Sequence, residues 1–318
     1  MAASSTNILV FGATGLIGKY ITEALINEKS SFGTIGIFTS KSTLDTKAPY
    51  IEFLRSQNVQ IHVGDVSDEK DILNAYKSYD TIICAFGRAV IASQIPLLAL
   101  AEQTPNIKRF FPSEYGTDIE YGPQSPKEKP HQQKLKVRKY IRENVKRVEV
   151  TYLVTGPYVD GYIGKPRADV RMGGFDVEKR KAYLLGSGKE RVAFTTMADV
   201  GRLLVAAVKS PEQSKNKALI VNSFTATPDE ILAEYEKQTG AKWEKEYIPL
   251  DQLKQLEEEA WEKGVPWATG FTLKRIWTEG GTLYESRDNE AIRFTNPDTL
   301  AEAVAKAIKV QDTAASEV

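Results

Sequence analysis

The sequence predicts an α/β fold built on a doubly wound parallel sheet, followed by a smaller C-terminal α/β lobe. Two observations carry this prediction. Short apolar runs alternate with segments of helical periodicity through the first half of the chain, as in successive right-handed βαβ units. From about residue 156, the alternation gives way to glycine-rich loops, short strands and a mostly helical region that holds all four tryptophans.

The elements follow in order along the chain. We predict strands at Ile8–Phe11, Thr34–Thr39, Val59–Val63, Thr81–Phe86, Arg109–Pro112 and Val148–Val154. We predict helices near residues 16–28, 46–57, 68–77, 91–103 and 131–145. Later in the chain we expect strands near Val192–Thr195 and Lys217–Asn222, and helix starts near Thr196, Thr227 and Asn296.

These patterns divide the 318 residues into two parts, and the length is sufficient for both. We assign residues 1–156, completed by about 192–223, to the larger domain. We assign residues 157–191 and 224–310 to the smaller lobe, which we expect to bind the substrate, and residues 311–318 to a frayed tail. The tryptophans are expected in the core of the lobe, with a minority of its aromatic residues lining a substrate cleft.

A glycine-spaced turn follows the first strand, with glycines at positions 12, 15 and 18. Gly12 permits the sharp turn, Gly15 leaves bare backbone for a pyrophosphate, and Gly18 lets the next helix pack closely. The spacing is GxxGxxG, and a glycine-rich loop without a ligand is the alternative. The strand before it and the helix after it favour an NAD(P)-binding Rossmann fold. We assign the following residues to the cofactor site: Gly12, Thr14, Gly15, Leu16 and Ile17.

The tip of the second strand indicates which dinucleotide is bound. Domains that bind NAD carry an acid there, whereas this strand ends in Thr39-Ser40-Lys41 and its first acid, Asp45, lies past the tip. Hydroxyls and a lysine accept the 2′-phosphate that a carboxylate repels. We therefore expect NADP(H), with Thr39, Ser40 and Lys41 as contacts; an ordinary polar turn is the alternative.

Two further strand ends belong to the predicted cofactor site. Asp65 follows the third strand and is expected either to accept a hydrogen bond from the adenine amino group or to cap the next helix. The fourth strand ends at Phe86 and Gly87, where a small residue lets the nicotinamide half cross the sheet edge.

Composition excludes several classes of function. Basic and acidic residues number 42 each, so no basic field indicates nucleic-acid binding. Cys84 is the only cysteine and is expected as a buried thiol rather than a nucleophile, and two histidines are too few for a histidine-based metal site. With no signal-like N-terminus and no run long enough to span a membrane, we expect a cytoplasmic monomer or homodimer.

Residues 109–116 read RFFPSEYG, and together with the glycine loop and the later KLKVR at 134–138 they resemble the isoflavone reductase-like family. This family belongs to the atypical short-chain dehydrogenases and includes phenylpropanoid reductases and NmrA-like proteins. The resemblance covers most of the chain and is strongest before residue 160. It implies that this segment forms the floor of the nicotinamide pocket, with Ser113 and Glu114 at the cofactor and Tyr115 and Gly116 at the substrate.

The resemblance also implies that Lys134, 20 residues after Glu114, contacts the cofactor and is a general acid/base. None of the fourteen tyrosines has the lysine four residues later that ordinary short-chain dehydrogenases use. Desolvation beside an oxidised nicotinamide is expected to lower the lysine pKa; a surface lysine is the alternative. Lys136 and Arg138 are predicted to lie on another helical face, in solvent. The preceding His131-Gln132-Gln133 departs from the family pattern, which leaves the substrate's shape open.

The function expected from these features is an NADPH-dependent reductase of a small aromatic or phenolic, isoflavonoid- or phenylpropanoid-like substrate. Tyr158 and Tyr162 follow the last strand of the first half and are expected to line the substrate cleft, with core packing as the alternative. Two other functions stay open: an NmrA-like regulator that senses the dinucleotide, and a non-redox cyclase or rearrangement enzyme. The presence of Lys134 favours an enzyme over a regulator.

Overall fold

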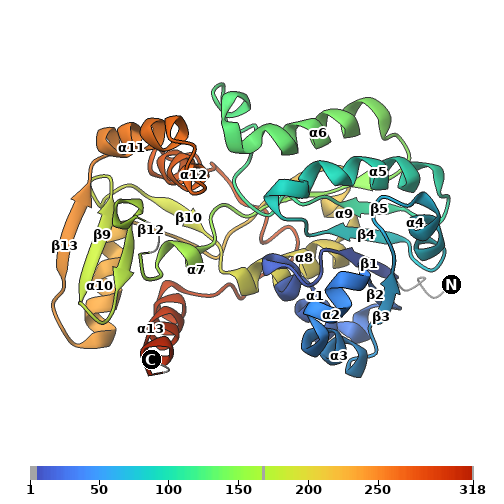
Figure 1. The fold of residues 1–318 in the computed structure, drawn as a ribbon, viewed down its shortest axis with the longest axis horizontal. Helices are drawn as coiled ribbons and strands as arrows, with labels where there is room; N and C mark the ends of the chain where they lie inside the picture. The colour runs from blue at the N-terminus through green and yellow to red at the C-terminus, as the bar shows by residue number, and fades with distance from the viewer. Residues whose placement is uncertain (1–5, 167–168, 317–318) are drawn as a thin grey trace.

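A six-stranded parallel sheet organises the larger part of the computed structural model, which describes residues 6–166 and 169–316 (Figure 1). The strand order is β3-β2-β1-β4-β5-β6. The strands are β1 (Ile8–Phe11), β2 (Ile35–Thr39), β3 (Gln60–Val63), β4 (Thr81–Cys84), β5 (Arg109–Phe111) and β6 (Glu149–Val150). After Thr151 the chain continues as β7 (Tyr152–Val154), which pairs in parallel with β11 (Ala218–Ile220). This order confirms the predicted Rossmann fold, whose ligands bind where the order reverses beside β1.

Helices cover both faces of this sheet because successive side chains of each strand point to opposite faces. Ile8 and Val10 of β1 pack with α1 (Leu16–Asn27), α3 (Ala48–Ser56) and α8 (Met197–Lys209). Leu9 and Phe11 pack on the other face with α4 (Glu69–Tyr76), α5 (Gln94–Gln103) and α6 (Gln132–Asn144). The carboxyl ends of the strands therefore stay open as the edge where a ligand can bind.

Two predicted helices begin differently from expectation. A separate short helix, α2 (Lys41–Thr46), precedes α3, because Pro49 in the first turn of α3 lacks an N–H and starts a new helix. The helix expected near 91–103 opens as a 3₁₀ segment, Arg88–Ser93, before α5 begins.

The second part has its own hydrophobic core, formed by two small sheets and several helices. One sheet has the order β13-β9-β8, and β10 pairs antiparallel with β12. The strands of this second part are β8 (Gly174–Asp176), β9 (Lys181–Leu185), β10 (Val192–Phe194), β12 (Phe224–Ala226) and β13 (Glu244–Ile248). Its helices are α7 (Val159–Tyr162), α10 (Pro228–Thr239), α11 (Leu250–Glu262), α12 (Ala268–Thr278) and α13 (Leu300–Ser316). Trp243, Trp261 and Trp277 belong to this core as expected, whereas Trp267 is exposed.

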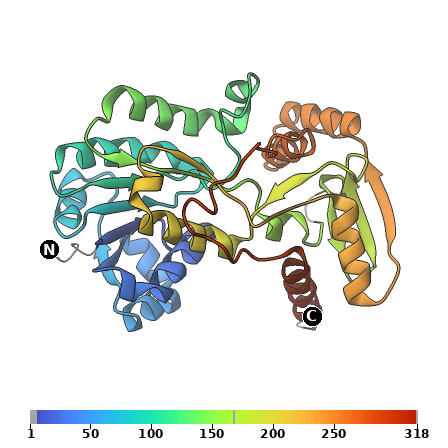
Figure 2. The same ribbon diagram turned by 180° about the vertical axis from the view of Figure 1, so that it is seen from behind.

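The packing refines the proposed division of the chain. Strand β10, which the sequence pattern assigns to the larger domain, contributes Val192 and Phe194 to the core of the lobe. Figure 2 shows the segment between α12 and α13 crossing the back of the larger part, where the backbone N–H of Asp288 donates to Ile220. We propose that the lobe includes β10 and that residues 282–294 belong with the larger domain.

The prediction of a frayed tail at residues 311–318 is wrong for residues 311–316, because these residues continue α13. No glycine or proline interrupts Leu300–Ser316, so the helix has no reason to stop. The Gln311 side chain donates to the carbonyl of Phe175 and accepts from the N–H of Val177, which ties this turn to the lobe. Residues 317–318 lie outside the described part of the chain.

Candidate functional site

The glycine loop is built for close approach of an anion. Gly12 has φ +77°, and a Cβ there would lie 2.5 Å from the carbonyl oxygen of Ala85. A Cβ at Gly18 would overlap the carbonyl oxygen of Gly12. Gly15 precedes α1 and supplies no capping side chain, so the first-turn N–H groups of Leu16 and Ile17 have no side-chain acceptor from it. These groups and the helix dipole are positioned to bind phosphate.

A cavity of about 550 Å³ opens beside this loop. Half of the residues predicted to contact the cofactor line it together: Gly12, Thr14, Thr39, Ser40, Lys41, Asp65 and Phe86. Gly15, Leu16, Ile17 and Gly87 do not line this cavity, although they continue the segments that do. The cavity therefore lies at the carboxyl ends of four strands, β1 to β4.

The tip of β2 combines hydroxyls with an unpaired cation. Ser40 caps α2, its Oγ accepting from the N–H of Thr43 at 3.2 Å, and its side chain is exposed at the cavity. Lys41 is exposed, and within residues 6–166 and 169–316 no carboxylate pairs with it. This tip can therefore receive an additional negative charge.

Asp65 does not cap the following helix. That role belongs to Asp68, whose Oδ1 accepts from the N–H of Lys70 at 2.8 Å. The Asp65 carboxylate accepts from the N–H of Ser67 at 2.8 Å and still lines the cavity. The prediction that Asp65 caps the next helix is therefore wrong, and its contact with adenine stays a prediction.

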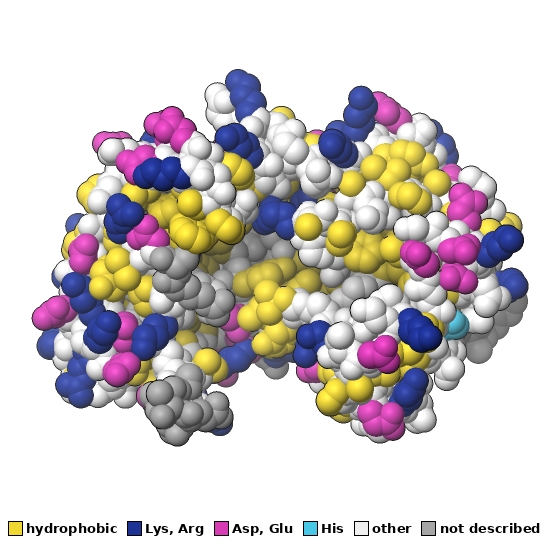
Figure 3. All heavy atoms as spheres, in the orientation of Figure 1, with side chains coloured by type: hydrophobic (Ala, Val, Ile, Leu, Met, Phe, Trp, Pro, Cys, Tyr) yellow, Lys and Arg dark blue, Asp and Glu magenta, His cyan; other side chains and the backbone are white. Residues whose placement is uncertain are grey.

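A second cavity, of about 290 Å³, lies between the two parts of the molecule. Figure 3 shows apolar side chains lining the hollow between the parts, with basic side chains at its edge. The predicted substrate residues line this cavity together with the predicted acid/base: Tyr115, Gly116, Lys134, Tyr158 and Tyr162. Eleven other residues line it that the sequence did not assign to the site, among them Arg88, His131, Leu273, Lys274 and Trp277.

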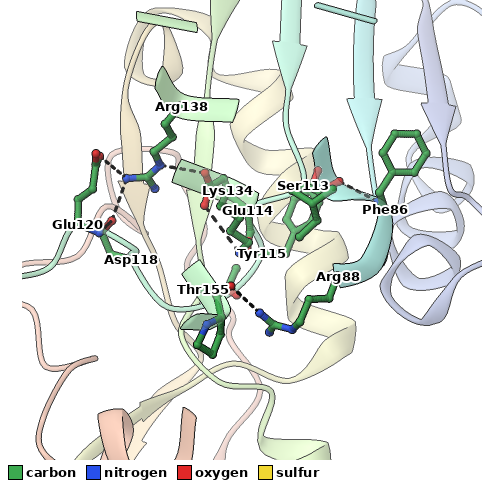
Figure 4. A network of polar contacts seen from close by, with 12 residues as sticks. Phe86, Arg88, Ser113, Glu114, Tyr115, Asp118, Glu120, Lys134, Arg138 and Thr155 are labelled. Carbon is green, nitrogen blue, oxygen red and sulfur yellow. Dashed lines mark hydrogen bonds and ion pairs between the residues drawn. The ribbon is translucent and has the colours of Figure 1, made fainter. Parts of the chain in front are cut away.

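Lys134 lies on α6 with its side chain only 12% exposed, which contradicts the surface-lysine alternative. Its Nζ donates to the carbonyl oxygen of Glu114 and lies 3.7 Å from Oε2 of the same residue (Figure 4). Burial is the main cause that lowers the pKa of Lys134 to about 8; the Glu114 carboxylate opposes it, and Arg88 and Arg138 add to it. Such an amine can exchange a proton near neutral pH.

The prediction that Arg138 lies in solvent is wrong. It follows Lys134 by four residues, and 3.6 residues per turn place both on the same face of α6. Its guanidinium is buried and pairs with Glu114 at 2.9 Å, Asp118 at 3.0 Å and Glu120 at 2.8 Å. Lys136 is exposed, as expected.

The Ser113 and Glu114 side chains line neither cavity. Ser113 Oγ accepts from the N–H of Phe86 at 2.7 Å (Figure 4). The backbone N–H of Ser113 donates to the side-chain oxygen of Gln94 at 2.7 Å. The first bond joins the ends of β4 and β5, and the second joins the end of β5 to α5. In this structure the two side chains hold the segment in shape beside both cavities, and direct contact with a cofactor stays a prediction.

The tyrosines of the second cavity have distinct environments. The hydroxyl of Tyr158 donates to the carbonyl of Tyr115 at 2.6 Å. The hydroxyls of Tyr115 and Tyr162 are buried and have no hydrogen-bond partner among the residues described. Burial raises the pKa of Tyr162, so this phenol stays protonated. Two buried hydroxyls without partners are consistent with a cavity whose ligand supplies polar atoms.

Three further features of the described residues bear on function. Cys84 is buried, and burial raises the pKa of its thiol, which favours the inert form. Among residues 6–166 and 169–316, no three His, Cys, Asp or Glu side chains gather as metal ligands. None of the described helices is both long and apolar enough to cross a membrane.

Comparison with known proteins places these features in context. Residues 4–287 match the model of the NmrA-like family. The isoflavone reductase of Pisum sativum is 31% identical over 265 residues, which cover 79% of this chain and 81% of that protein. A crystal structure of isoflavone reductase has a TM-score of 0.80 at 26% identity, with 95% of this chain and 99% of that chain covered. The leucoanthocyanidin reductase–NADPH complex of Vitis vinifera has a TM-score of 0.77 at 20% identity, with 95% and 99% covered.

Proposed function

We propose that this chain, which belongs to the NmrA-like family as its motifs predicted, is an NADPH-dependent reductase of a small aromatic or phenolic substrate. The observation that carries the proposal is Lys134, a mostly buried lysine with a lowered pKa at the wall of an aromatic cavity. The similarity to pea isoflavone reductase agrees with the NADP-dependent oxidoreductase expected from the sequence.

The residues around the first cavity fit NADPH. The loop at 12–18 excludes side chains and offers helix N–H groups to a pyrophosphate, and the β2 tip offers hydroxyls and Lys41 to a 2′-phosphate. Asp65 would hold the adenine, and the segments at 86–87 and 113–116 would flank the nicotinamide. When bound, the cofactor supplies a hydride.

The chain itself supplies the proton chemistry. As a free amine, Nζ of Lys134 can accept a phenol proton; as an ammonium, it can return a proton to a substrate oxygen that gains charge. Glu114 orients this group through its carbonyl and its carboxylate, and Arg138 fixes that carboxylate in turn. Tyr158, Tyr162 and Trp277 line the cavity and offer aromatic surface to a substrate ring.

A screen for NADPH consumption tests the proposal. The purified protein is incubated with NADPH and a panel of phenolic ethers, enones and isoflavonoid-like ketones, and products are identified by mass. We expect consumption with at least one class and a product two hydrogens heavier. Tight NADPH binding with no consumption across the panel would favour the sensing regulator instead, and an isomeric product without consumption would favour the rearrangement enzyme.

A further inference from the structure

A second lysine, Lys274 on α12, lines the same cavity as Lys134. The residue is only 8% exposed. Its Nζ lies 3.9 Å from the ring centroid of Tyr162 and 5.8 Å from that of Trp277. Within the described residues, no carboxylate lies at ion-pair distance from Nζ, and no oxygen accepts a hydrogen bond from it.

This isolation distinguishes Lys274 from the other buried cations of the site. Lys134 contacts Glu114, and Arg138 contacts three carboxylates. Even Arg275, the next residue of α12, pairs with Glu128, Glu257 and Glu279. Carboxylates are thus available on one side of this helix, and the side that faces the cavity has none.

An ammonium buried without an oxygen partner is costly, because the aromatic rings replace only part of its hydration. Burial alone lowers the pKa of Lys274 to about 7. Lys274 lines the same cavity as the reacting lysine, Lys134. A ligand bound in that cavity can therefore supply the oxygen partner that the Lys274 ammonium lacks.

We propose that Lys274 binds an acidic oxygen of the substrate, a carboxylate or a phenol, on the lobe side of the cavity. The inference rests on the proposed function and narrows its substrate class. The substrate is an aromatic molecule with its reacting oxygen at Lys134 and a second, acidic oxygen at Lys274. Lys274 is therefore a residue that determines specificity, because a neutral substituent in that position leaves it unpaired.

Binding of four related probes to the NADP⁺-loaded protein tests this assignment by calorimetry at pH 7. The first probe, 4-hydroxycinnamate, carries both a carboxylate and a phenol. 4-Methoxycinnamate carries only the carboxylate, and methyl 4-hydroxycinnamate carries only the phenol. Methyl 4-methoxycinnamate carries neither acidic group. The variants are Lys274→Met, which keeps an unbranched side chain and removes the ammonium, and Lys263→Met as control. Lys263 is exposed at the end of α11, outside the cavity.

We expect at least one acidic probe to bind wild type about tenfold or more tightly than the neutral probe, methyl 4-methoxycinnamate. Lys274→Met should reduce that gain to about twofold or less, and Lys263→Met should keep it. The single-group probes show whether the carboxylate or the phenol carries the gain. Equal binding of all four probes to wild type, no binding of any, or a gain that survives in Lys274→Met would overturn the assignment. A gain in binding, combined with no NADPH consumption across the substrate panel of the screen above, would support the anion site and contradict the reductase proposal.

Discussion

Arg138 holds one carboxylate oxygen of Glu114 at 2.9 Å, which leaves the other oxygen of that carboxylate 3.7 Å from Nζ of Lys134. Glu114 is thus shared between a permanent cation and a titrating one. Because Arg138 also pairs with Asp118 and Glu120, its position is fixed from two sides. The arrangement keeps a negative charge beside Lys134 while burial acts to remove the lysine's proton.

Glu114→Gln should lower the pKa of Lys134 further below its value of about 8, because the charge that opposes burial is lost. The limb of the kcat/KM profile that reports Lys134 should therefore move to lower pH. Glu120→Gln is the control, since Glu120 contacts Arg138 and not Lys134. A profile that moves equally in both variants, or in neither, would show that Glu114 does not tune the lysine.

Gly15→Val should abolish dinucleotide binding while the fold is retained. A Cβ at this position would already lie 3.2 Å from the carbonyl oxygen of Gly12, and the two further methyl groups would occupy the space expected for the pyrophosphate. Calorimetric titration of the folded variant with NADPH checks this. Undiminished affinity would mean that the loop does not hold the phosphates.

Lys41→Ala should narrow the preference for NADPH over NADH by about tenfold, because one charge-assisted contact at an exposed site contributes about 1–2 kcal/mol. Lys47→Ala is a matched control, since Lys47 is exposed in the same segment and does not line the cavity. Dissociation constants for both cofactors provide the measurement. Equal binding of NADH and NADPH by the wild type would contradict the interpretation of the β2 tip.

Lys274→Met should stabilise the protein, because it removes a buried ammonium that has no anionic partner among the described residues. In the folded chain the pKa of Lys274 is lowered from 10.5 to about 7, so between these values the unfolded chain binds more protons. The wild type therefore gains stability as pH rises through this window, and the gain from the substitution is largest at pH 7 and below. Thermal unfolding of wild type and variant at pH 6 and pH 10 measures this change in stability. A variant that is less stable than wild type at pH 6 would contradict the prediction.

The parts of the fold that depend on local pattern could be predicted from the sequence. The glycine loop, the alternating strands and helices and the open tip of β2 each leave a signal within a few residues. Lys134 was found because its spacing from residues 109–116 matches a known family.

Other features depend on tertiary packing and left no such signal. Lys274 lies in a helix without a motif, and only the packing of α12 against the larger part brings it into the cavity. The burial of Arg138 was predictable in principle, since four residues separate it from Lys134 on one helix, but its three acidic partners come from residues 114–120. The end of α13 was missed because its polar residues at 311–313 resemble a tail, although Gln311 bonds to β8.

The most direct test of the central claim compares turnover of Lys134→Ala and Lys136→Ala. Lys134→Ala should reduce kcat by about 10²–10⁴-fold, the usual contribution of one positioned acid/base group, with NADPH affinity little changed. Lys136 is exposed and about 200° around the helix from Lys134, so its substitution should leave kcat near wild type. Equal losses in the two variants, or no loss in either, would contradict the assignment of Lys134 as the acid/base.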